Sequence, residues 1–353
     1  MLDFEGVPMF YTPYRYNYSW NSDHINAENN NYRLNSFSLL DHGITGSNQI
    51  VTFQTIGSVD LNHSFFTNGT SLSDDEFGVP FNETIDNHRK IKRYDFLGEE
   101  IDYSISSTFA AGLIAGKPYN YADSDDKNYS GVALDSKLHV IEMNQTIFYE
   151  SSVLDLGTTL DMMKKVGSYI CANNFVFNNK FWSYSEDINY YAWKNKDILY
   201  IYPSGDTGDV ILSPGDALNA LTVGSCQNIT GNPSETSSKG PTLSASKKPD
   251  VVAPGEGILS SLSRIPFSNS TIDSLVTLNG SIASTAQIAG IAALVRQYFV
   301  DGFYPTLSAK AENSMIPSSA LIKSVIINSA RNTSASPLYD PKNGFGIPFI
   351  SDA

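Results

Sequence analysis

Short apolar runs alternate along the chain with stretches in which hydrophobic residues recur at helical spacing. The apolar runs are rich in β-branched and aromatic residues, which predicts strands at 50–53, 137–143, 197–202 and 220–226. The stretches of helical spacing predict helices at 108–115, 152–166, 186–194, 285–299 and 318–330. Strand–helix–strand alternation of this kind implies a parallel sheet with helices on both faces. We therefore expect an α/β fold.

Two of the predicted helices have a defined apolar side. In the helix at 285–299 the residues that share one face are Ile288, Ala292, Val295 and Phe299. In the last predicted helix Leu321, Val325 and Asn328 fall on one side. We expect these sides to face the core.

Two polar regions interrupt the alternation. Residues 1 to about 40 are rich in Tyr and Asn, and we interpret residues 1–42 as an irregular N-terminal arm. Residues 60–100 are polar and carry clusters of charge, which favours a long surface insertion. The sequence shows no internal repeat and no Gly/Ser-rich linker, so we expect residues 43–353 to form one domain.

Composition and charge exclude several classes of protein. Of the 353 residues 41% are hydrophobic and 12% aromatic, which suits a packed core and argues against disorder. The formal net charge is −14 and no basic stripe appears, so we expect no nucleic-acid partner. No apolar run approaches the ~20 residues of a membrane span. Residues 1–5 lack the features of a signal peptide, so either the protein is intracellular or the sequence begins downstream of a removed leader.

Cysteines and glycosylation sequons bear on the compartment. Cys171 and Cys226 allow at most one disulfide, and we expect two buried free thiols. Ten Asn-x-Ser/Thr sequons favour a secreted, vesicular or surface glycoprotein, although an intracellular location stays open. One sequon, at Asn279, lies in a turn before a predicted helix, and the others begin at Asn17, Asn62, Asn68, Asn82, Asn128, Asn144, Asn228, Asn269 and Asn332.

A series of short motifs follows in a fixed order from residue 43 onward. They are Gly-Ile-Thr-Gly at 43–46, Ala-Gly-Leu-Ile-Ala-Gly at 111–116, Ser-Ser-Lys-Gly-Pro at 237–241, Lys-Pro-Asp-Val-Val-Ala-Pro-Gly at 248–255, Ala-Gly at 289–290 and Gly-Phe-Gly at 344–346. Together they resemble the subtilisin-like serine peptidases (subtilases, peptidase family S8), especially those of protists. The resemblance covers roughly residues 43–353. It implies a subtilisin-like, doubly wound and mostly parallel sheet with helices on both faces.

Peptidase activity in that family requires Asp, His and Ser, because the His takes the Ser proton and the Asp holds the His. The family pattern Asp-Thr-Gly-Leu-Asp-x-x-His is similar to residues 56–63 and places Ile56 on the Asp. The pattern His-Gly-Thr-His-Val-Ala-Gly places Ser106 on the His. The pattern Gly-Thr-Ser-Met-Ala-Thr-Pro matches without gaps from residue 280 and places Ile282 on the nucleophile. The resemblance therefore implies that no position of the triad is intact.

Two supporting positions differ from the family as well. The Asn that donates to the oxyanion corresponds to Asp206, which brings negative charge where a donor is needed. A Gly that lines the substrate groove corresponds to Val176, whose side chain would fill part of that groove.

A shifted alignment provides an alternative nucleophile. With one residue deleted before the turn and one inserted after it, 281–284 resembles the family's Ser-Met-Ala-Ser and Ser281 takes the nucleophile position. A base would still be missing, because the helix at 108–115 contains no histidine. The histidines are His24, His42, His63, His88 and His139, of which we expect the last to be a satisfied core or sheet-face residue.

Metal chemistry has little support in the sequence. No His/Cys/Asp cluster has the spacing of a zinc site. The acidic run at 123–126 permits a structural calcium ion, but it lacks the glycine and closing glutamate of a dedicated loop, so we expect a solvated acidic loop and no cofactor.

The sequence thus predicts a catalytically inactive protein of the subtilisin fold. Such a pseudopeptidase would act in binding or as a structural component of an assembly with protein partners. The alternative is an active serine endopeptidase that uses Ser281 with a displaced base.

Overall fold

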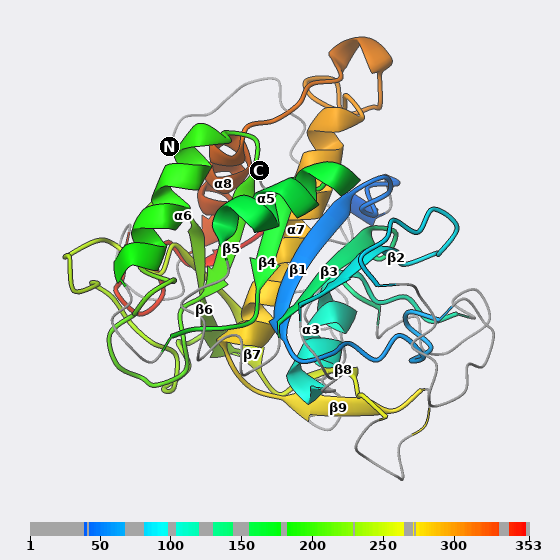
Figure 1. Cartoon of the computed structure of the whole chain (residues 1–353). Helices are drawn as coiled ribbons and strands as arrows, with labels where there is room; N and C mark the ends of the chain where they lie inside the picture. The colour runs from blue at the N-terminus through cyan, green and yellow to red at the C-terminus, as the bar shows by residue number, and fades with distance from the viewer. Residues whose placement is uncertain are drawn as a thin grey trace, which may run out of the picture.

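A parallel sheet forms the centre of the computed structural model, which describes residues 39–40, 42–67, 81–97, 104–119, 130–143, 155–177, 182–228, 230–264, 271, 273–331 and 339–350. Within these ranges the strand order is β2-β3-β1-β4-β5-β6-β7, and every pairing is parallel (Figure 1). The strands are β1 (Ile50–Ile56), β2 (Ile91–Phe96), β3 (Lys137–Met143), β4 (Ile170–Asn173), β5 (Leu199–Pro203), β6 (Leu221–Gln227) and β7 (Val251–Glu256). The predicted α/β fold with a parallel sheet is confirmed.

Helices cover both faces of this sheet (Figure 1). On one face α3 (Ile105–Ala115) packs against α7 (Ser281–Val300), and α8 (Ser319–Asn328) packs on α7 in turn. On the other face α5 (Leu156–Val166) packs against α6 (Trp182–Lys194). Two antiparallel ribbons lie outside the sheet, one of β8 (Ile258–Ser261) with β9 (Leu275–Leu278) and one of β10 (Ala330–Arg331) with β11 (Ile347–Pro348).

Alternation along the strands creates two hydrophobic clusters, because successive side chains of a strand point to opposite faces. In β5, Leu199 and Ile201 belong to the cluster around α3 and α7, whereas Tyr200 and Tyr202 belong to the cluster around α5 and α6. Cys171 of β4 lies in the second cluster, and both cysteines are buried free thiols, as predicted.

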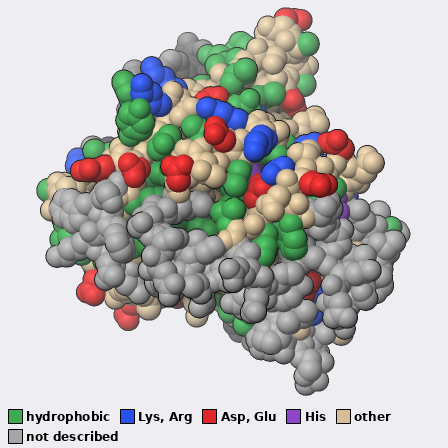
Figure 2. All heavy atoms as spheres, viewed as in Figure 1, with side chains coloured by type: hydrophobic (Ala, Val, Ile, Leu, Met, Phe, Trp, Pro, Cys, Tyr) green, Lys and Arg blue, Asp and Glu red, His purple; other side chains and the backbone are tan. Residues whose placement is uncertain are grey.

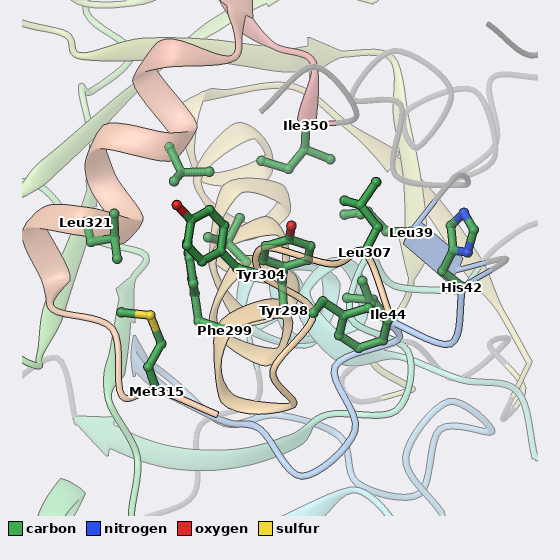
Figure 3. Close-up of a pocket in the computed structure, with 13 residues that line it drawn as sticks. Leu39, His42, Ile44, Tyr298, Phe299, Tyr304, Leu307, Met315, Leu321 and Ile350 are labelled. Carbon is green, nitrogen blue, oxygen red and sulfur yellow. The ribbon is translucent and has the colours of Figure 1, made fainter. Parts of the chain in front are cut away.

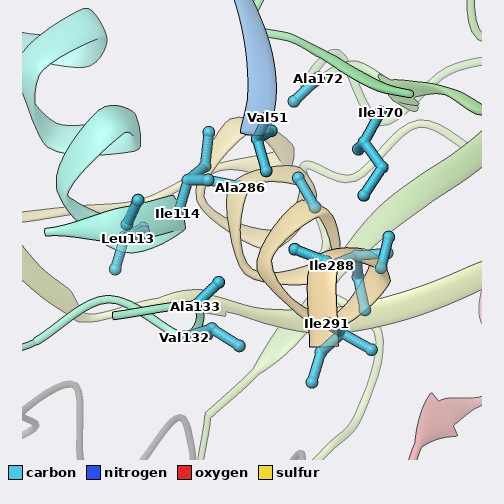
Figure 4. Packing of buried hydrophobic residues seen from close by; sticks show 14 of the residues in the cluster. Val51, Leu113, Ile114, Val132, Ala133, Ile170, Ala172, Ala286, Ile288 and Ile291 are labelled. Carbon is cyan, nitrogen blue, oxygen red and sulfur yellow. The ribbon is translucent and has the colours of Figure 1, made fainter. Parts of the chain in front are cut away.

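Helix α7 is buried on nearly all sides. The prediction of a single buried face, formed by Ile288, Ala292, Val295 and Phe299, therefore included too few of its residues. Most of its side chains are buried, among them the small residues Ala283, Ala286 and Ala289. A Cβ atom on Gly290 would lie 2.6 Å from the Cβ atom of Val132, so only glycine allows this close approach. Figure 4 shows residues from α3, β1 and β4 gathered around this helix.

Two other predictions need correction. The region 60–100 is not simply a surface insertion, because β2 lies within it and Phe65 and Phe66 are buried. Helix α8 buries Ile322 and Ile326, whereas Leu321 and Val325 are only partly buried. Leu321 and Val325 do pack against the core cluster, but Ile322 and Ile326 are the residues that α8 buries fully.

A buried ionic cluster joins β7 to α8. The Asp250 carboxylate lies 2.6 Å from the Lys248 Nζ atom and 2.9 Å from the Lys323 Nζ atom, and it accepts the Thr222 N–H at 2.8 Å. These contacts compensate for the removal of the charges from water. The 248–255 motif thus forms edge strand β7 and supplies the ion pair that connects this edge to helix α8.

Both edges of the sheet are paired with other segments of the chain. Beside β2, Asn82 and Ile85 donate their N–H groups to the carbonyl groups of Tyr94 and Lys92. Beside β7, Val252 donates to the Gly346 carbonyl and Phe345 donates to the Asp250 carbonyl. The outer backbone groups of both edge strands are therefore partly used within the molecule.

Candidate active-site cleft

The positions that correspond to the family triad lie where the parallel strands end. Ile56 is the last residue of β1, Ser106 is the second residue of α3, and Ile282 is the second residue of α7. All three side chains are partly exposed. The carboxyl edge of a parallel sheet is where such folds usually place their sites. The three positions are thus partly exposed, and in that alignment none of them carries the acid, the base or the nucleophile of the family.

Neighbouring polar side chains form a closed network instead. Thr55 Oγ1 lies 2.6 Å from Ser107 Oγ and accepts the Asn174 side-chain amide at 2.6 Å. Ser107 Oγ also donates to the Ile56 carbonyl at 3.0 Å, and Ile56 N–H donates to Asn174 Oδ1 at 3.3 Å. These bonds join β1, α3 and the residue after β4. The network holds the end of β1 without an ionisable group.

Asp206 occupies the N-terminal end of α7. Its carboxylate accepts the Ser281 backbone N–H at 2.7 Å and the Ser281 hydroxyl at 3.1 Å. A helix N-terminus favours negative charge, so the carboxylate stabilises α7 as a cap from another segment. Taken over the whole residue, Asp206 is exposed, but its carboxylate is largely surrounded by protein, and this burial raises the carboxyl pKa. The hydrogen bonds from Ser281 act in the opposite direction and lower it. A carboxylate therefore occupies the position that the alignment matches to the oxyanion-binding Asn of the family.

Neither serine of the shifted alignment is available as a nucleophile in this conformation. Ser281 is fully buried, and its Oγ atom accepts the Gly205 N–H at 3.2 Å while it donates to Asp206. Ser284 is also fully buried, and its hydroxyl donates to the Ala253 carbonyl at 2.8 Å. Both hydroxyl groups hold α7 against neighbouring segments.

The buried histidines are engaged in other parts of the molecule. The His63 Nε2 atom lies 2.8 Å from the Ser274 carbonyl, and its Nδ1 atom accepts the Phe65 N–H. Burial lowers the pKa of His63 to about 4. The His88 Nδ1 atom accepts two backbone N–H groups, and burial with nearby cations lowers the pKa of His88 to about 4. His24 lies outside the described residues.

One hydroxyl–imidazole–carboxylate row does exist, but it crosses the interior of the sheet. His139 of β3 lies 2.8 Å from Asp95 of β2 and 3.0 Å from Thr52 of β1, and Arg93 pairs with Asp95 at 2.6 Å. Thr52 and His139 have no exposed surface, and Asp95 is 1% exposed. Burial lowers the pKa of His139, although Asp95 opposes this. No substrate reaches these atoms, so the row is a structural connection between strands, as expected for His139.

Val176 lies beside the segment that carries Asp206. A Cβ atom on Gly205 would be 3.8 Å from the Val176 Cγ1 atom, and Val176 is partly exposed. Its isopropyl group thus borders the loop of the oxyanion position, where the family has a glycine. The expectation that it fills part of the groove remains a prediction.

The asparagines of the glycosylation sequons differ in their exposure to solvent. Asn62 and Asn228 are each 6% exposed, which argues against a glycan on either in the folded chain. Asn82 and Asn279 are exposed. The remaining predicted acceptors lie outside the described residues, namely Asn17, Asn68, Asn128, Asn144, Asn269 and Asn332.

The acidic run at 123–126 also lies outside the described residues. In the described part of the chain, no group of three or more His, Cys, Asp or Glu residues is placed to hold a metal ion. No described helix is both long enough and apolar enough to cross a bilayer. Figure 2 shows acidic and basic side chains interspersed over the described part of one face.

Comparison with known proteins agrees with this architecture. The CspB protease of Clostridium perfringens superposes with a TM-score of 0.69 at 15% identity, over 92% of this chain and 96% of that one. The prenylagaramide maturation protease PagA superposes with a TM-score of 0.62 at 18% identity, over 90% of this chain and 96% of that one. At such identities the likeness defines the fold, which is that of subtilisin-like proteases.

The sequence profile of the subtilase family matches residues 38–346, so the chain belongs to the subtilase family, peptidase S8. The serine protease/ABC transporter B family protein tagB of Dictyostelium discoideum is 23% identical over 83% of this chain. The serine protease AprX of Bacillus subtilis is 36% identical over 27% of this chain and 24% of its own length. The chain spans only 20% of the length of tagB.

Sequence reasoning missed two features, one at the start of α7 and one inside the sheet. The pairing of Asp206 with Ser281 joins residues far apart in the chain, and no local pattern signals it. The buried position of Asp95 beside His139 was not predicted, because the charged sequence of β2 favoured a surface insertion. The alternation of Arg93 and Asp95 was the available signal, because it places both side chains on one face of a strand.

Proposed function

We propose that this chain is a non-catalytic member of the subtilase family that acts in binding or as a structural component of an assembly. The observation that carries the proposal is the Asp206 carboxylate on the first N–H and hydroxyl of α7. A tetrahedral oxyanion would meet negative charge there instead of a donor. In subtilisin, loss of one such donor alone costs about 10²–10³ in rate.

The triad positions support the same conclusion. Ile56 and Ile282 bring alkyl groups where a carboxylate and a hydroxyl are needed, and Ser106 cannot act as a general base near neutral pH. The Ser106 hydroxyl lies 2.9 Å from the Ser104 hydroxyl. Proteolysis would need an acid, a base and a nucleophile at once, and the three residues that the alignment matches to the triad supply none of these.

Partners in this proposal are proteins or other parts of a longer protein. Much of tagB lies outside the matched region, which fits a subtilase domain used as one block among several. The exposed sequon at Asn82 supports a secreted or surface location.

A fluorophosphonate probe tests the proposal directly. The full chain would be incubated with the probe beside an active subtilase and analysed by intact mass and peptide mapping. We expect no adduct on the chain under conditions that label the active enzyme completely. An adduct on Ser281 that disappears in Ser281→Ala, or an adduct on Ser284, would show that the shifted alignment is right and that the protein is an active serine endopeptidase.

The variant Asp206→Asn sharpens the test. It restores the amide of the family's oxyanion position but adds no base and no nucleophile. We expect this variant to stay unlabelled. Labelling of the variant alone would mean that Asp206 is what silences an otherwise competent site.

A further inference from the structure

An apolar pocket lies at the far end of α7 from the cleft. It has a volume of about 490 Å³ and is enclosed by the C-terminal part of α7, the following segment, α8 and the turn that begins at Leu39. Helix α7 has 20 residues, so at ~1.5 Å per residue the two sites are about 30 Å apart. Figure 3 shows the side chains of Phe299, Tyr304 and Leu307 turned toward a common space. The pocket is thus separate from the candidate active site.

The chemistry of the pocket favours an uncharged, aromatic occupant. Tyr298 stacks on Phe303 with ring centroids 5.8 Å apart, which gives one wall two parallel rings. His42 is the only titratable side chain other than tyrosine among its described lining residues, and none of them is Asp, Glu, Lys or Arg. The rim is apolar as well, since Tyr304 is 56% exposed and Met315 is 39% exposed. Apolar surface of this kind commonly marks a docking site.

The sequence before Leu39 contains a segment that fits such a pocket. Tyr14, Tyr16, Tyr18 and Trp20 alternate with polar residues at 15, 17 and 19. Strict alternation predicts an extended segment with all four rings on one side. That side needs an apolar surface to cover it, whereas the sequon at Asn17 falls on the opposite, polar side.

We propose that the aromatic side of residues 14–20 binds in this pocket of the same chain. The chain enters the described fold at Leu39, which itself lines the pocket. The residues between Trp20 and Leu39 span up to about 60 Å when extended, so the reach is ample. Attachment to the same chain raises the effective concentration into the millimolar range, which makes even a weak contact persistent. The N-terminal segment would then cover the end of α7.

Photo-crosslinking in the full chain tests this binding. A benzoylphenylalanine placed at Leu307, which is 38% exposed at the rim, should crosslink to a peptide within 14–20 of the same molecule. The matched control is the same group at Tyr190, which is 53% exposed on α6 and should give no such crosslink. Mixing isotope-labelled and unlabelled chains separates crosslinks within one molecule from those between two.

Variants of the N-terminal segment complete the test. Replacing Tyr16 and Tyr18 together by Ser should reduce the crosslink yield by about tenfold or more, as buried aromatic anchors do. The polar-side substitution Arg15→Ser should leave the yield unchanged. Crosslinks only between two chains, no crosslink to residues 1–38, or a small molecule held in the pocket on native mass spectrometry would each overturn the proposal.

Discussion

Resistance to urea should decrease when the pH falls from 7 to 5, because burial lowers the pKa of His63, His88 and His139 in the folded chain. The His88 Nδ1 atom accepts the N–H groups of Lys90 at 3.1 Å and Ile91 at 2.9 Å, so a proton on that atom would break both bonds. The pKa is about 4 for His88 and about 4 for His63 in the folded chain, against about 6.5 for an unfolded histidine. Between these values the unfolded state binds protons that the folded state does not, so stability is lost as the pH drops.

The size of the effect follows from the lowered pKa. Each pH unit below about 6.5 costs ~1.4 kcal/mol per histidine, so His63 and His88 each contribute a loss of about 2 kcal/mol by pH 5. The variant His88→Asn keeps a side-chain acceptor for the backbone N–H groups but does not titrate. Its stability should therefore fall by about 2 kcal/mol less than that of the unmodified chain over this range.

Urea unfolding followed by tryptophan fluorescence at pH 7, 6 and 5 measures this difference. If the unmodified chain and His88→Asn lose the same stability between pH 7 and pH 5, His88 is not held neutral and the reasoning fails.

Three further substitutions test the packing in the same unfolding assay. Asp250→Ala leaves two lysine charges without their partner and should cost about 3–5 kcal/mol, whereas Asp209→Ala at an exposed site should change stability by less than about 0.5 kcal/mol. Gly290→Ala forces a Cβ atom against the Val132 side chain and should cost at least about 1–3 kcal/mol, more than Gly43→Ala, where strain arises only from a φ of +79°. Asp155→Ala removes the carboxylate that caps α5 at Gly157 and Thr158 and should cost about 1 kcal/mol; an unchanged midpoint would contradict the cap.

Local pattern predicted four of the seven strands of the central sheet, β1, β3, β5 and β6, and missed β2, β4 and β7. The strand at 137–143 was predicted with its observed bounds, because Leu138, Val140, Ile141 and Met143 make a mostly apolar run in spite of three polar residues. Strand β2 was missed, because Lys92, Arg93 and Asp95 make its sequence polar. Its charges are tolerated because Arg93 pairs with Asp95 and Asp95 with His139 on the adjacent strand. Such compensation depends on strand order, which a local pattern does not contain.

The candidate site likewise combines positions that motif alignment could predict with contacts that depend on the tertiary structure. The alignment of motifs matched Ile56 and Ile282 to triad positions, and the predicted strand at 50–53 and helix at 285–299 were too short to include either residue, which lie at the end of β1 and the start of α7. The capping of Ser281 by Asp206 depends on how the end of β5 meets α7. The domain boundary at residue 43 is a prediction that the described residues do not test.

The pairing of both sheet edges limits how this protein can assemble. An open edge strand lets copies of a chain join by main-chain hydrogen bonds, and such growth has no natural end point. Here the segment at 82–85 runs along β2 and the segment at 345–346 runs along β7, so the sheet offers little backbone for an incoming strand. In the described part of the chain, growth of copies through the edges of the central sheet is therefore disfavoured.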